Sequence, residues 1–512
     1  MAATETKTLT PSSGLVNSIA NISGLLIPLV IFFLVTPILI NKLGASHFGI
    51  LTLFLAGVAL VASFDFGLNS GGTRALGEAL YKDGNKYFIA LAYEWWSAYL
   101  VLGSIMAALI FILGLLFFYI FGIDDLLIFN IRWHILSSFT ITTFCGFCTA
   151  SCQLVWRAKE MFLGSMVLQV TYGSILWLGC GSIAWLGFGI AYILGWIAAL
   201  SVLFVFINKF SLMYLLKEYR WLPRFYFKNI VKSRAYNLYA FSAQVASNMT
   251  YHADKFIISA LLGPVLVGYY GIASNLSSKI LMLVATGSGF IFPRVVRLSA
   301  QSETKSLSDT YLQASRYVML LSWPLVIIAI IFGGQFLRLW LGDEISIEVV
   351  GPLRLLLVAY FINSLSVIAS QVFNGIGNAK VGAFFATTGA IVNLLGCLVL
   401  IPFFGLIGVA LASVLASLQV FIFMILLHRH LELNDWPFIH FWGRMALVSV
   451  APIIVAFGLF GLINGWLSFL IIATGVWSLF YILWFGFGFA DDAETAIIYR
   501  LYSGIKYPFG KR

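Results

Sequence analysis

The stretch LGASHFG at residues 43–49 returns as LGPVLVG at residues 262–268, 219 positions later. Leucine and glycine are common in this chain, so one such match carries little weight. A nearly constant distance between several matches is much harder to obtain by chance, and it predicts that the two halves share one topology. Three further pairs lie 218 to 220 positions apart: Gln153 and Gln371, Gly187 and Gly405, and Arg74 and Arg294.

The composition is too apolar for a soluble protein. Of 512 residues, 61% are hydrophobic and only 10% are charged, whereas soluble domains carry roughly 25% charged residues. The stretch FDFGLNSGGTR at residues 64–74 contains the letters of a kinase DFG loop and of a glycine-rich phosphate loop. A kinase needs a lysine strand and a catalytic loop upstream, and a Walker loop needs GK[ST] where this chain has GGTR. Soluble kinases and P-loop enzymes are therefore excluded.

Fourteen apolar segments are long enough to cross a membrane, because a spanning helix needs roughly 20 apolar residues. The first segment is too long for a cleavable signal peptide, and Lys7 ahead of it is balanced by Glu5. The expected spans are 15–41, 48–70, 87–121, 131–155, 161–184, 187–215, 235–262, 265–292, 310–333, 347–373, 381–402, 406–428, 441–463 and 465–488.

Basic residues between the spans predict the orientation. With a cytoplasmic N-terminus, 24 of the 30 lysines and arginines fall on the cytoplasmic side, among them Lys209 at the end of the sixth span. Lys255 and Lys279 lie inside spans, and the net charge of +10 reflects topology and anionic headgroups rather than nucleic acid. Both termini are predicted to be cytoplasmic. Four basic residues fall on the opposite side: Lys42, Arg132, Arg338 and Arg354.

The repeat and the spans together predict an all-α polytopic membrane protein. Helices 1–6 and 7–12 should form two six-helix lobes, followed by two extra C-terminal helices. Two like lobes around a shared cavity are typical of transporters in which one lobe rocks against the other. The predicted parts are an N-tail at 1–14, a first lobe at 15–217, a basic cytoplasmic linker at 218–234, a second lobe at 235–430, helices 13–14 at 431–488 and a C-tail at 489–512.

Two stretches resemble one known family. LGASHFGILTLFLAGVALVASFDFGLNSGGTRALGEA at 43–79 resembles the first hairpin of Wzx-type O-antigen flippases, and DKFIISALLGPVLVGYYGIASNL at 254–276 resembles their seventh and eighth helices. These proteins form the polysaccharide transporter branch of the multidrug/oligosaccharidyl-lipid/polysaccharide exporter superfamily. The resemblance implies lobes that open alternately, a lipid-diphosphate-linked oligosaccharide as cargo and an ion gradient as the driving force.

Lys279 lies near the middle of the expected span 265–292, with Asn275 one turn away. The lysine is roughly 20 Å from each surface at 1.5 Å per residue. A charge at this depth costs at least about 2.5–3.5 kcal/mol, so it should face a wet cavity or a partner. The alternative, for Lys279 and for Lys255 alike, is a structural ion pair with a neighbouring carboxylate.

Lys255 belongs to a polar stripe on the span 235–262 that includes Asn248 and Tyr251. Because an ammonium group binds phosphate as a point charge, we expect Lys255 and Lys279 to bind the diphosphate of the cargo, with Asn248, Tyr251 and Asn275 beside them. Arg74 is the third basic candidate for this role. Its simpler interpretation is a cytoplasmic anchor that pairs with Glu78 four residues later.

Three carboxylates are expected inside or near the membrane, at Asp65, Glu94 and Asp254. Acids at such depth are costly without a role, and we expect one of them to take up a proton or a sodium ion. On this assignment the first lobe holds two deep acids and no deep lysine. No cofactor or metal site is expected, because no set of ligands with metal-binding spacing occurs.

Two other functions compete with the flippase. A multidrug/cation antiporter of the same superfamily would suit a cavity of acids and aromatics, but it usually has twelve helices, and the deep lysines disfavour it. A polysaccharide polymerase or glycosyltransferase needs a sizeable polar loop, and the outer segment at 334–346 is too short. The expected protein is not an enzyme. It is expected in the bacterial inner membrane, with membrane lipids, a coupling cation and the cargo as partners, and with a polymerase and a chain-length regulator as further candidates.

Overall fold

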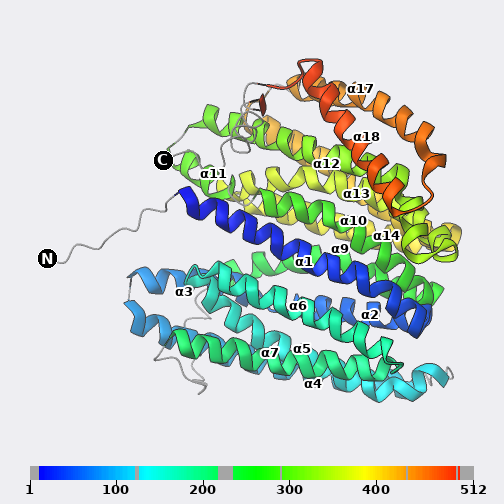
Figure 1. The fold of residues 1–512 in the computed structure, drawn as a ribbon. Helices are drawn as coiled ribbons and strands as arrows, with labels where there is room; N and C mark the ends of the chain where they lie inside the picture. The colour runs from blue at the N-terminus through cyan, green and yellow to red at the C-terminus, as the bar shows by residue number, and fades with distance from the viewer. Residues whose placement is uncertain are drawn as a thin grey trace, which may run out of the picture.

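The computed structural model describes residues 11–82, 84–120, 126–216, 234–288, 291–301, 303–433, 436–491 and 494–495. Within these ranges every regular element is a helix, and most helices run along one common direction (Figure 1). The expected all-α class is confirmed. We call the end where α1 begins and α2 ends the inner end, because the basic residues predict cytoplasm there, and the opposite end the outer end.

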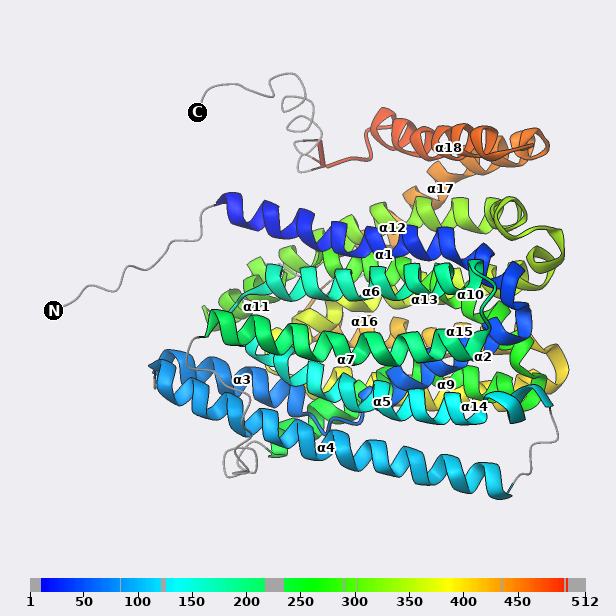
Figure 2. The same cartoon turned by 60° about the horizontal axis from the view of Figure 1, so that its bottom comes forward.

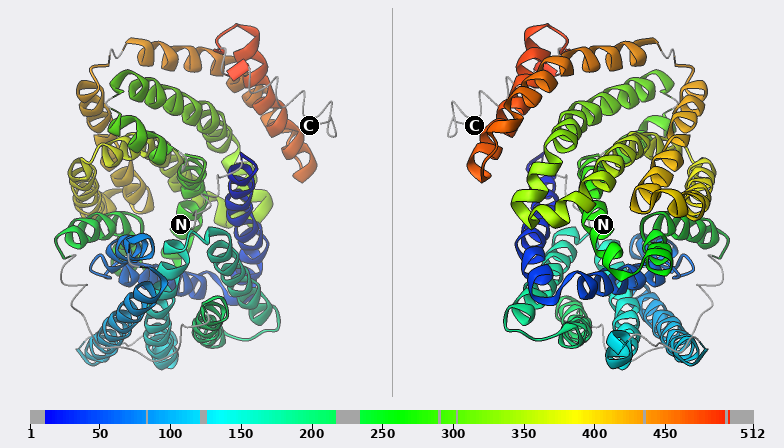
Figure 3. Two further views of the ribbon diagram at one scale, coloured as in Figure 1. Left: turned by 90° about the vertical axis from the view of Figure 1, so that its left-hand side faces the viewer. Right: turned by 90° about the vertical axis from the view of Figure 1, so that its right-hand side faces the viewer.

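The first half of the described chain forms one lobe of seven helices, including one short amphipathic helix, α3. The helices are α1 (Pro11–Leu43), α2 (Ala45–Ala62), α3 (Leu68–Lys82), α4 (Gly84–Ile120), α5 (Leu126–Ala158), α6 (Phe162–Trp185) and α7 (Ile190–Leu215). In the end-on views these helices group on one side of the molecule, and α1 lies along the boundary with the second half (Figure 3).

The second half repeats this order and adds a hairpin. The lobe consists of α9 (Arg234–Leu262), α10 (Pro264–Gly287), α11 (Ile291–Ala300), α12 (Thr304–Leu341), α13 (Asp343–Gly375), α14 (Ala379–Phe404), α15 (Leu406–Ser417) and α16 (Gln419–His430). The hairpin of α17 (Trp436–Leu459), a short 3₁₀ turn (Phe460–Leu462) and α18 (Trp466–Gly486) lies outside both lobes (Figure 2).

Eleven helical stretches of the described chain are long and apolar enough to cross a membrane. The other three expected spans fall on α1, α9 and α10, so the expected fourteen are compatible with the structure. Helices α9 and α10 fall short in hydropathy because they carry most of the polar residues singled out above. The second span was placed at 48–70, but α2 ends at Ala62.

The predicted repeat is visible in the turns. Gly44 and Gly263 each precede the second helix of a half, with φ of 82° and 88°, values that only glycine adopts at little cost. The two halves then place a short amphipathic helix, α3 or α11, at the same inner end (Figure 1). The repeated letters therefore mark repeated backbone geometry.

The two copies of the opening motif meet each other at the boundary between the lobes. Helices α2 and α10 pack together, and a Cβ atom on Gly49 would collide with the backbone carbonyl of Pro264. A Cβ on Gly268 would lie 3.2 Å from the backbone nitrogen of Gly49. Small residues let membrane helices approach this closely. The motif that reveals the repeat also forms part of the contact between the lobes.

Gly49→Ala should therefore destabilise the protein. Overpacking of a tight contact costs about 1–3 kcal/mol, which should lower the unfolding temperature in detergent. Gly195→Ala is the matched control, because a Cβ on this helical glycine would meet nothing within 4 Å. Equal unfolding temperatures for the two variants would contradict the close contact between α2 and α10.

A second contact joins the lobes near the outer end. Pro37 has no N–H, so the carbonyl of Phe33, four residues earlier in α1, has no helical partner. The indole Nε1 of Trp340 in α12 donates to this carbonyl at 2.7 Å. The rings of Phe33 and Trp340 stack with centroids 4.8 Å apart, and Trp466 of α18 packs on Phe33 at 5.7 Å. The first lobe, the second lobe and the hairpin thus meet in one aromatic cluster.

The stretch FDFGLNSGGTR forms the turn from α2 into α3. The Asp65 carboxylate accepts hydrogen bonds from the backbone N–H groups of Gly67 at 2.9 Å and Asn69 at 3.1 Å, as a helix cap does. Phe66 adopts a φ of 51° and projects its ring onto Phe241 of α9, with centroids 5.0 Å apart. The stretch is a cap and a contact between the lobes, which agrees with the exclusion of a kinase or phosphate loop.

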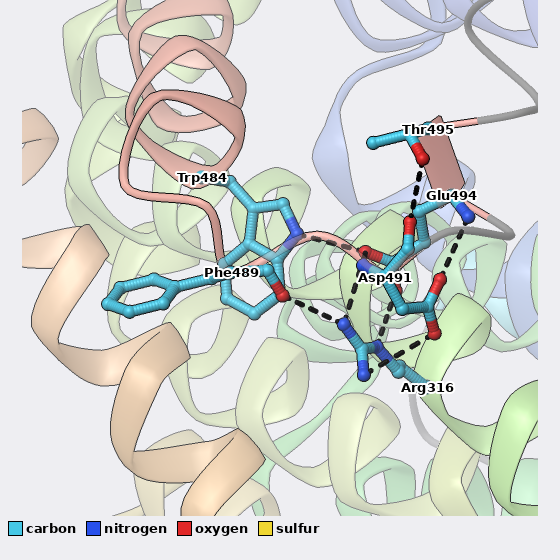
Figure 4. A network of polar contacts seen from close by, with 6 residues as sticks. All are labelled: Arg316, Trp484, Phe489, Asp491, Glu494 and Thr495. Atoms are coloured by element: carbon cyan, nitrogen blue, oxygen red, sulfur yellow. Dashed lines mark hydrogen bonds and ion pairs between the residues drawn. The ribbon is translucent and has the colours of Figure 1, made fainter.

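The hairpin is fixed to the second lobe at the inner end by Arg316 of α12 (Figure 4). The guanidinium binds the buried carboxylate of Glu494 through two nitrogens, lies 3.4 Å from Asp491 and donates to the carbonyl of Phe489 at 2.9 Å. Trp484 Nε1 donates to the same Glu494 carboxylate at 3.2 Å. The segment that follows α18 is thereby held against α12.

Candidate functional site

The second lobe contains a polar cavity of about 250 Å³ between α9, α10, α13, α14, α15 and α16. Its polar lining consists mainly of hydroxyl and amide side chains, with Asp254 as the one carboxylate among the described lining residues. Such groups coordinate cations and carry protons. The polar residues that line it include Ser247, Thr250, Tyr251, Asp254, Tyr270, Tyr360, Asn363, Ser366, Ser370, Ser413, Ser417 and Gln419.

Asp254 and Lys255 form a buried ion pair on α9. Their side chains are 4% and 6% exposed, and the Lys255 Nζ lies 3.2 Å from Asp254 Oδ1. Lys255 Nζ also donates to the carbonyl of Tyr251 at 2.7 Å and lies 5.5 Å from the centre of the Tyr270 ring. The pairing means that Lys255 neutralises a charge of the protein itself, which is the alternative that the sequence left open for it.

Tyr251 closes one side of the cavity with an aromatic pair. Its ring stacks on Tyr360 of α13 with centroids 5.8 Å apart and planes 10° apart. The Tyr360 hydroxyl lies 3.5 Å from the hydroxyl of Ser274 in α10. The cavity therefore combines one carboxylate, aromatic rings and hydroxyl groups. Asn248, the next residue of the predicted stripe, is half-buried on α9 and does not line the cavity.

Lys279 is half-buried on α10 and has no hydrogen-bond or ion-pair partner among the described residues. Asn275 lies one turn away and donates to the carbonyl of Gly271 at 3.0 Å, so it does not reach toward the lysine. Because α10 ends at Gly287, Lys279 is eight residues from the inner end of the helix, or about 12 Å. The expected distance of roughly 20 Å was therefore too large on this side, but the amine still lies inside the span.

The two lysines are not brought together. Lys255 is seven residues from the outer end of α9, and Lys279 is fifteen residues from the outer end of α10. At 1.5 Å per residue their depths differ by about 12 Å. Since Lys255 is also held by Asp254, Lys279 remains the stronger candidate for an anionic group.

Arg74 lies on the surface of α3, where its Nε is 3.0 Å from Glu78 Oε1. The predicted pairing over four residues is confirmed. The Arg74 side chain is 62% exposed, which agrees with its simpler interpretation as a surface anchor at the inner end.

The other two acids of the prediction lie in the first lobe. Asp65 is buried in the turn after α2 rather than inside a span, and Tyr99 donates to it at 3.4 Å in addition to its two backbone bonds. Burial raises the pKa of Asp65, and the bonds from Gly67 and Asn69 oppose this rise. Its contacts are those of a cap. Glu94 is 4% exposed and lies ten residues into α4.

Sequence reasoning missed a buried lysine in the first lobe. Lys209 was counted among the cytoplasmic residues, but its side chain is 0% exposed in α7, with Nζ 3.6 Å from the centre of the Trp96 ring. The statement that the first lobe holds no deep lysine was therefore wrong. Its position six residues before the end of α7 looked like a loop position, because sequence alone does not tell which side of a helix is covered.

The serines, threonines and amides of the cavity were missed as well. They come from four different helices, and a single Ser or Thr in an apolar helix is an unremarkable residue. The only usable signal in the sequence was the number of Ser, Thr and Asn residues on α9, α13 and α15. Among the described residues, no group of three or more His, Cys, Asp or Glu side chains could hold a metal ion.

Comparison with known families decides the classification. The family model described as polysaccharide biosynthesis protein matches residues 13–299, more than half of the chain. The chain belongs to this family. A second model, MatE, matches residues 240–399 within the second half. The predicted resemblance to the polysaccharide branch of the exporter superfamily is thereby confirmed.

Individual members of the family and related proteins are distant. The protein named "Putative O-antigen transporter" of Shigella flexneri is 24% identical over 170 residues, 33% of this chain and 40% of the relative. The protein named "Probable low-salt glycan biosynthesis flippase Agl15" of Haloferax volcanii is 24% identical over 236 residues, 46% of this chain and 49% of the relative. The chain thus aligns with less than half the length of either relative.

Solved structures show that the fold is that of the exporter superfamily. Lipid II flippase MurJ in an inward closed conformation has a TM-score of 0.67 at 15% identity, covering 93% of this chain and 100% of the other. An inward-facing multidrug resistance MATE transporter has a TM-score of 0.62 at 16% identity, covering 81% and 99%. At these identities the likeness concerns the fold alone.

Proposed function

We propose that this protein is a flippase that moves a lipid-diphosphate-linked oligosaccharide of the undecaprenyl type across the bacterial inner membrane for surface polysaccharide synthesis. The observation that carries the proposal is Lys279, a half-buried amine within a spanning helix that has no partner among the described residues. A diphosphate headgroup supplies the missing charge. The family and the names of two relatives, an O-antigen transporter and a glycan biosynthesis flippase, support the same cargo class. The chain acts as a transporter, not as an enzyme.

Transport is proposed to proceed by alternating access and to use an ion gradient. The two lobes touch near the outer end through small residues at Gly49 and Gly268 and through the aromatic rings of Phe33 and Trp340. These contacts would have to part when the lobes open to the outside. Asp254 is the proposed coupling acid, since it lines a polar cavity. Protons and sodium ions both fit such a carboxylate. Glu94 is the second candidate, and Asp65 is the weakest because it caps α3.

The second candidate function is a multidrug/cation antiporter. It is favoured by the MatE match over residues 240–399 and by the cavity, which sets a carboxylate among the rings of Tyr251, Tyr270 and Tyr360. A lipophilic cation would suit this lining. Lys279 does not line this cavity, and a fixed amine on the transport path would repel a cation.

Reconstituted vesicles separate the two functions. A fluorescent oligosaccharide linked through diphosphate to a short polyprenol should become accessible to a membrane-impermeant quencher on the opposite leaflet only when the protein is present. A fluorescent lipophilic cation should stay where it was added. Gradient-driven movement of the cation without movement of the glycolipid would make the antiporter the correct assignment.

The proposed topology has both termini in the cytoplasm, with membrane lipids around the bundle and a polymerase and chain-length regulator as candidate partners. Reporter fusions after Lys232 and at the C-terminus should indicate cytoplasm, and a fusion at Asp343 should indicate periplasm. Asp343 begins α13 directly after α12, so a reporter fused there indicates on which side of the membrane the outer end lies. A periplasmic C-terminus would refute an even number of spans with a cytoplasmic start.

A further inference from the structure

The short helix α11 exposes a face that combines basic and apolar side chains. Its buried side, Ile291, Val295 and Leu298, packs into a hydrophobic cluster with α12, α13 and α16. Its exposed side carries Arg294 and Arg297, together with Phe292 at 43% and Val296 at 42% exposure. Two apolar side chains thus lie on the exposed side of α11 together with its two arginines.

The helix packs closely against α13. A Cβ atom on Gly375 of α13 would collide with the Val295 side chain, so the absence of a side chain at Gly375 lets α11 approach α13 closely. Val295 itself is 0% exposed. This packing directs the opposite face of α11, with its exposed arginines, away from α13.

The positive charge of α11 is not neutralised within the described chain. The helix contains no acidic residue, and neither Arg294 nor Arg297 has a hydrogen-bond or ion-pair partner among the described residues. The equivalent helix of the first half, α3, differs: its exposed residues in the described part are Arg74 and Glu78, which pair at 3.0 Å. The repeat thus provides the same element once with its exposed arginine paired and once with two arginines that have no partner among the described residues.

The two kinds of side chain are sorted around the helix. At 100° per residue, Phe292 and Val296 lie about 40° apart on one flank, and Arg294 and Arg297 lie about 60° apart on the other. Helices that lie in a membrane surface show this arrangement, with the apolar flank among acyl chains and the basic flank among headgroups. Lys305, at the start of α12, is exposed at the same inner end, as is Glu303 directly before that helix.

We propose that α11 is a docking site for the phosphate headgroups of anionic membrane lipids at the inner surface. Arg294 and Arg297 bind the headgroup phosphate, and Phe292 and Val296 lie among the first methylene groups of the acyl chains. Charge complementarity selects an anionic lipid over a zwitterionic one, by about fivefold in affinity for each arginine near the surface. Because α11 connects α10 to α12, a bound lipid would fix the depth of the helix that carries Lys279.

Lipid binding to the full-length protein in detergent tests this proposal independently of transport. Native mass spectrometry should show tighter binding of phosphatidylglycerol than of phosphatidylcholine to the wild type. Arg294→Gln/Arg297→Gln should lower the phosphatidylglycerol affinity at least about tenfold and leave phosphatidylcholine unchanged. Arg294→Lys/Arg297→Lys should keep most of the affinity, which separates loss of charge from loss of fold. Arg74→Gln is the matched control in α3 and should bind phosphatidylglycerol as the wild type does.

Two results would overturn the proposal. Equal phosphatidylglycerol binding by the wild type and the double glutamine variant would show that the face does not bind anionic lipid. A variant that keeps phosphatidylglycerol affinity but loses binding of farnesyl diphosphate would assign the arginines to the cargo instead. In either case the proposed flippase function is not affected, because the vesicle assay measures glycolipid transport and not headgroup binding at α11.

Discussion

Asp254→Asn is expected to abolish the response of transport to an ion gradient. The variant keeps the shape of the side chain and one acceptor for Lys255, whose Nζ lies 3.2 Å from Asp254 Oδ1, but it cannot change its charge. Losing a charge-assisted interaction removes about 1.5–3 kcal/mol, which corresponds to roughly a ten- to hundredfold lower rate. The measurement is glycolipid movement in vesicles with and without an imposed proton or sodium gradient.

A double variant separates coupling from structure. Removing one partner of a buried ion pair leaves the other charge uncompensated, at a cost of about 3–5 kcal/mol, so Asp254→Asn can also lower stability. Asp254→Asn/Lys255→Gln removes both charges and should restore the unfolding temperature without restoring gradient-driven transport. If transport returns together with stability, Asp254 only neutralises Lys255 and the coupling role is refuted. Glu78→Gln, on the exposed pair of α3, is the control for a neutralised acid.

The fold was accessible from sequence because its determinants are periodic or repeated. The apolar runs placed the helices, and the offset of about 219 residues predicted that the two halves share one topology. Gly44 and Gly263 do adopt the same turn. The pairing of Arg74 with Glu78 followed from helix spacing alone. These features depend on local geometry, which a single sequence carries.

The site was less accessible because it depends on which face of each helix is covered. Asp65 seemed to lie within the second span, but α2 ends at Ala62 and the carboxylate caps the next helix. Nothing in the apolar sequence marks the end of α2 at Ala62, because the first helix-breaking residues, Gly67 and Asn69, come several positions later. Lys209 was misplaced for the opposite reason, since it lies near a helix end but under the ring of Trp96.

The pairing of Asp254 and Lys255 shows a further limit of predicting a site from helical-wheel projections. A wheel projection places neighbouring residues about 100° apart, so it puts Asp254 on a different face from the polar stripe that contains Lys255. A lysine side chain is long enough to turn back along the helix, and Lys255 does so to reach both Asp254 and the Tyr251 carbonyl. Projection therefore gives where a side chain starts, not where its charged end lies.

The same pairing changes what is expected of the two lysines. Lys255→Ala should act mainly through stability, because it strands the buried Asp254 carboxylate. Lys279 has no carboxylate partner among the described residues, so its removal should leave the fold intact. The sequence predicted the same role for the two lysines. We now expect Lys255→Ala to lower stability, and the removal of Lys279 to lower transport without a loss of stability.

Lys279→Glu should abolish glycolipid transport while protein level and unfolding temperature stay close to those of the wild type. A fixed amine that binds a diphosphate contributes about 1.5–3 kcal/mol through charge-assisted hydrogen bonds, and reversing its sign adds repulsion to that loss. Lys279→Arg keeps the charge and should retain much of the activity, whereas Lys279→Gln should lose roughly ten- to hundredfold. Transport is measured in vesicles with the diphosphate-linked glycolipid and, in cells, as surface polysaccharide. If Lys279 were structural, the glutamate variant would insert poorly, and an acid-to-lysine change elsewhere would rescue it. A stable Lys279→Ala variant with full activity would remove the headgroup site from this helix altogether.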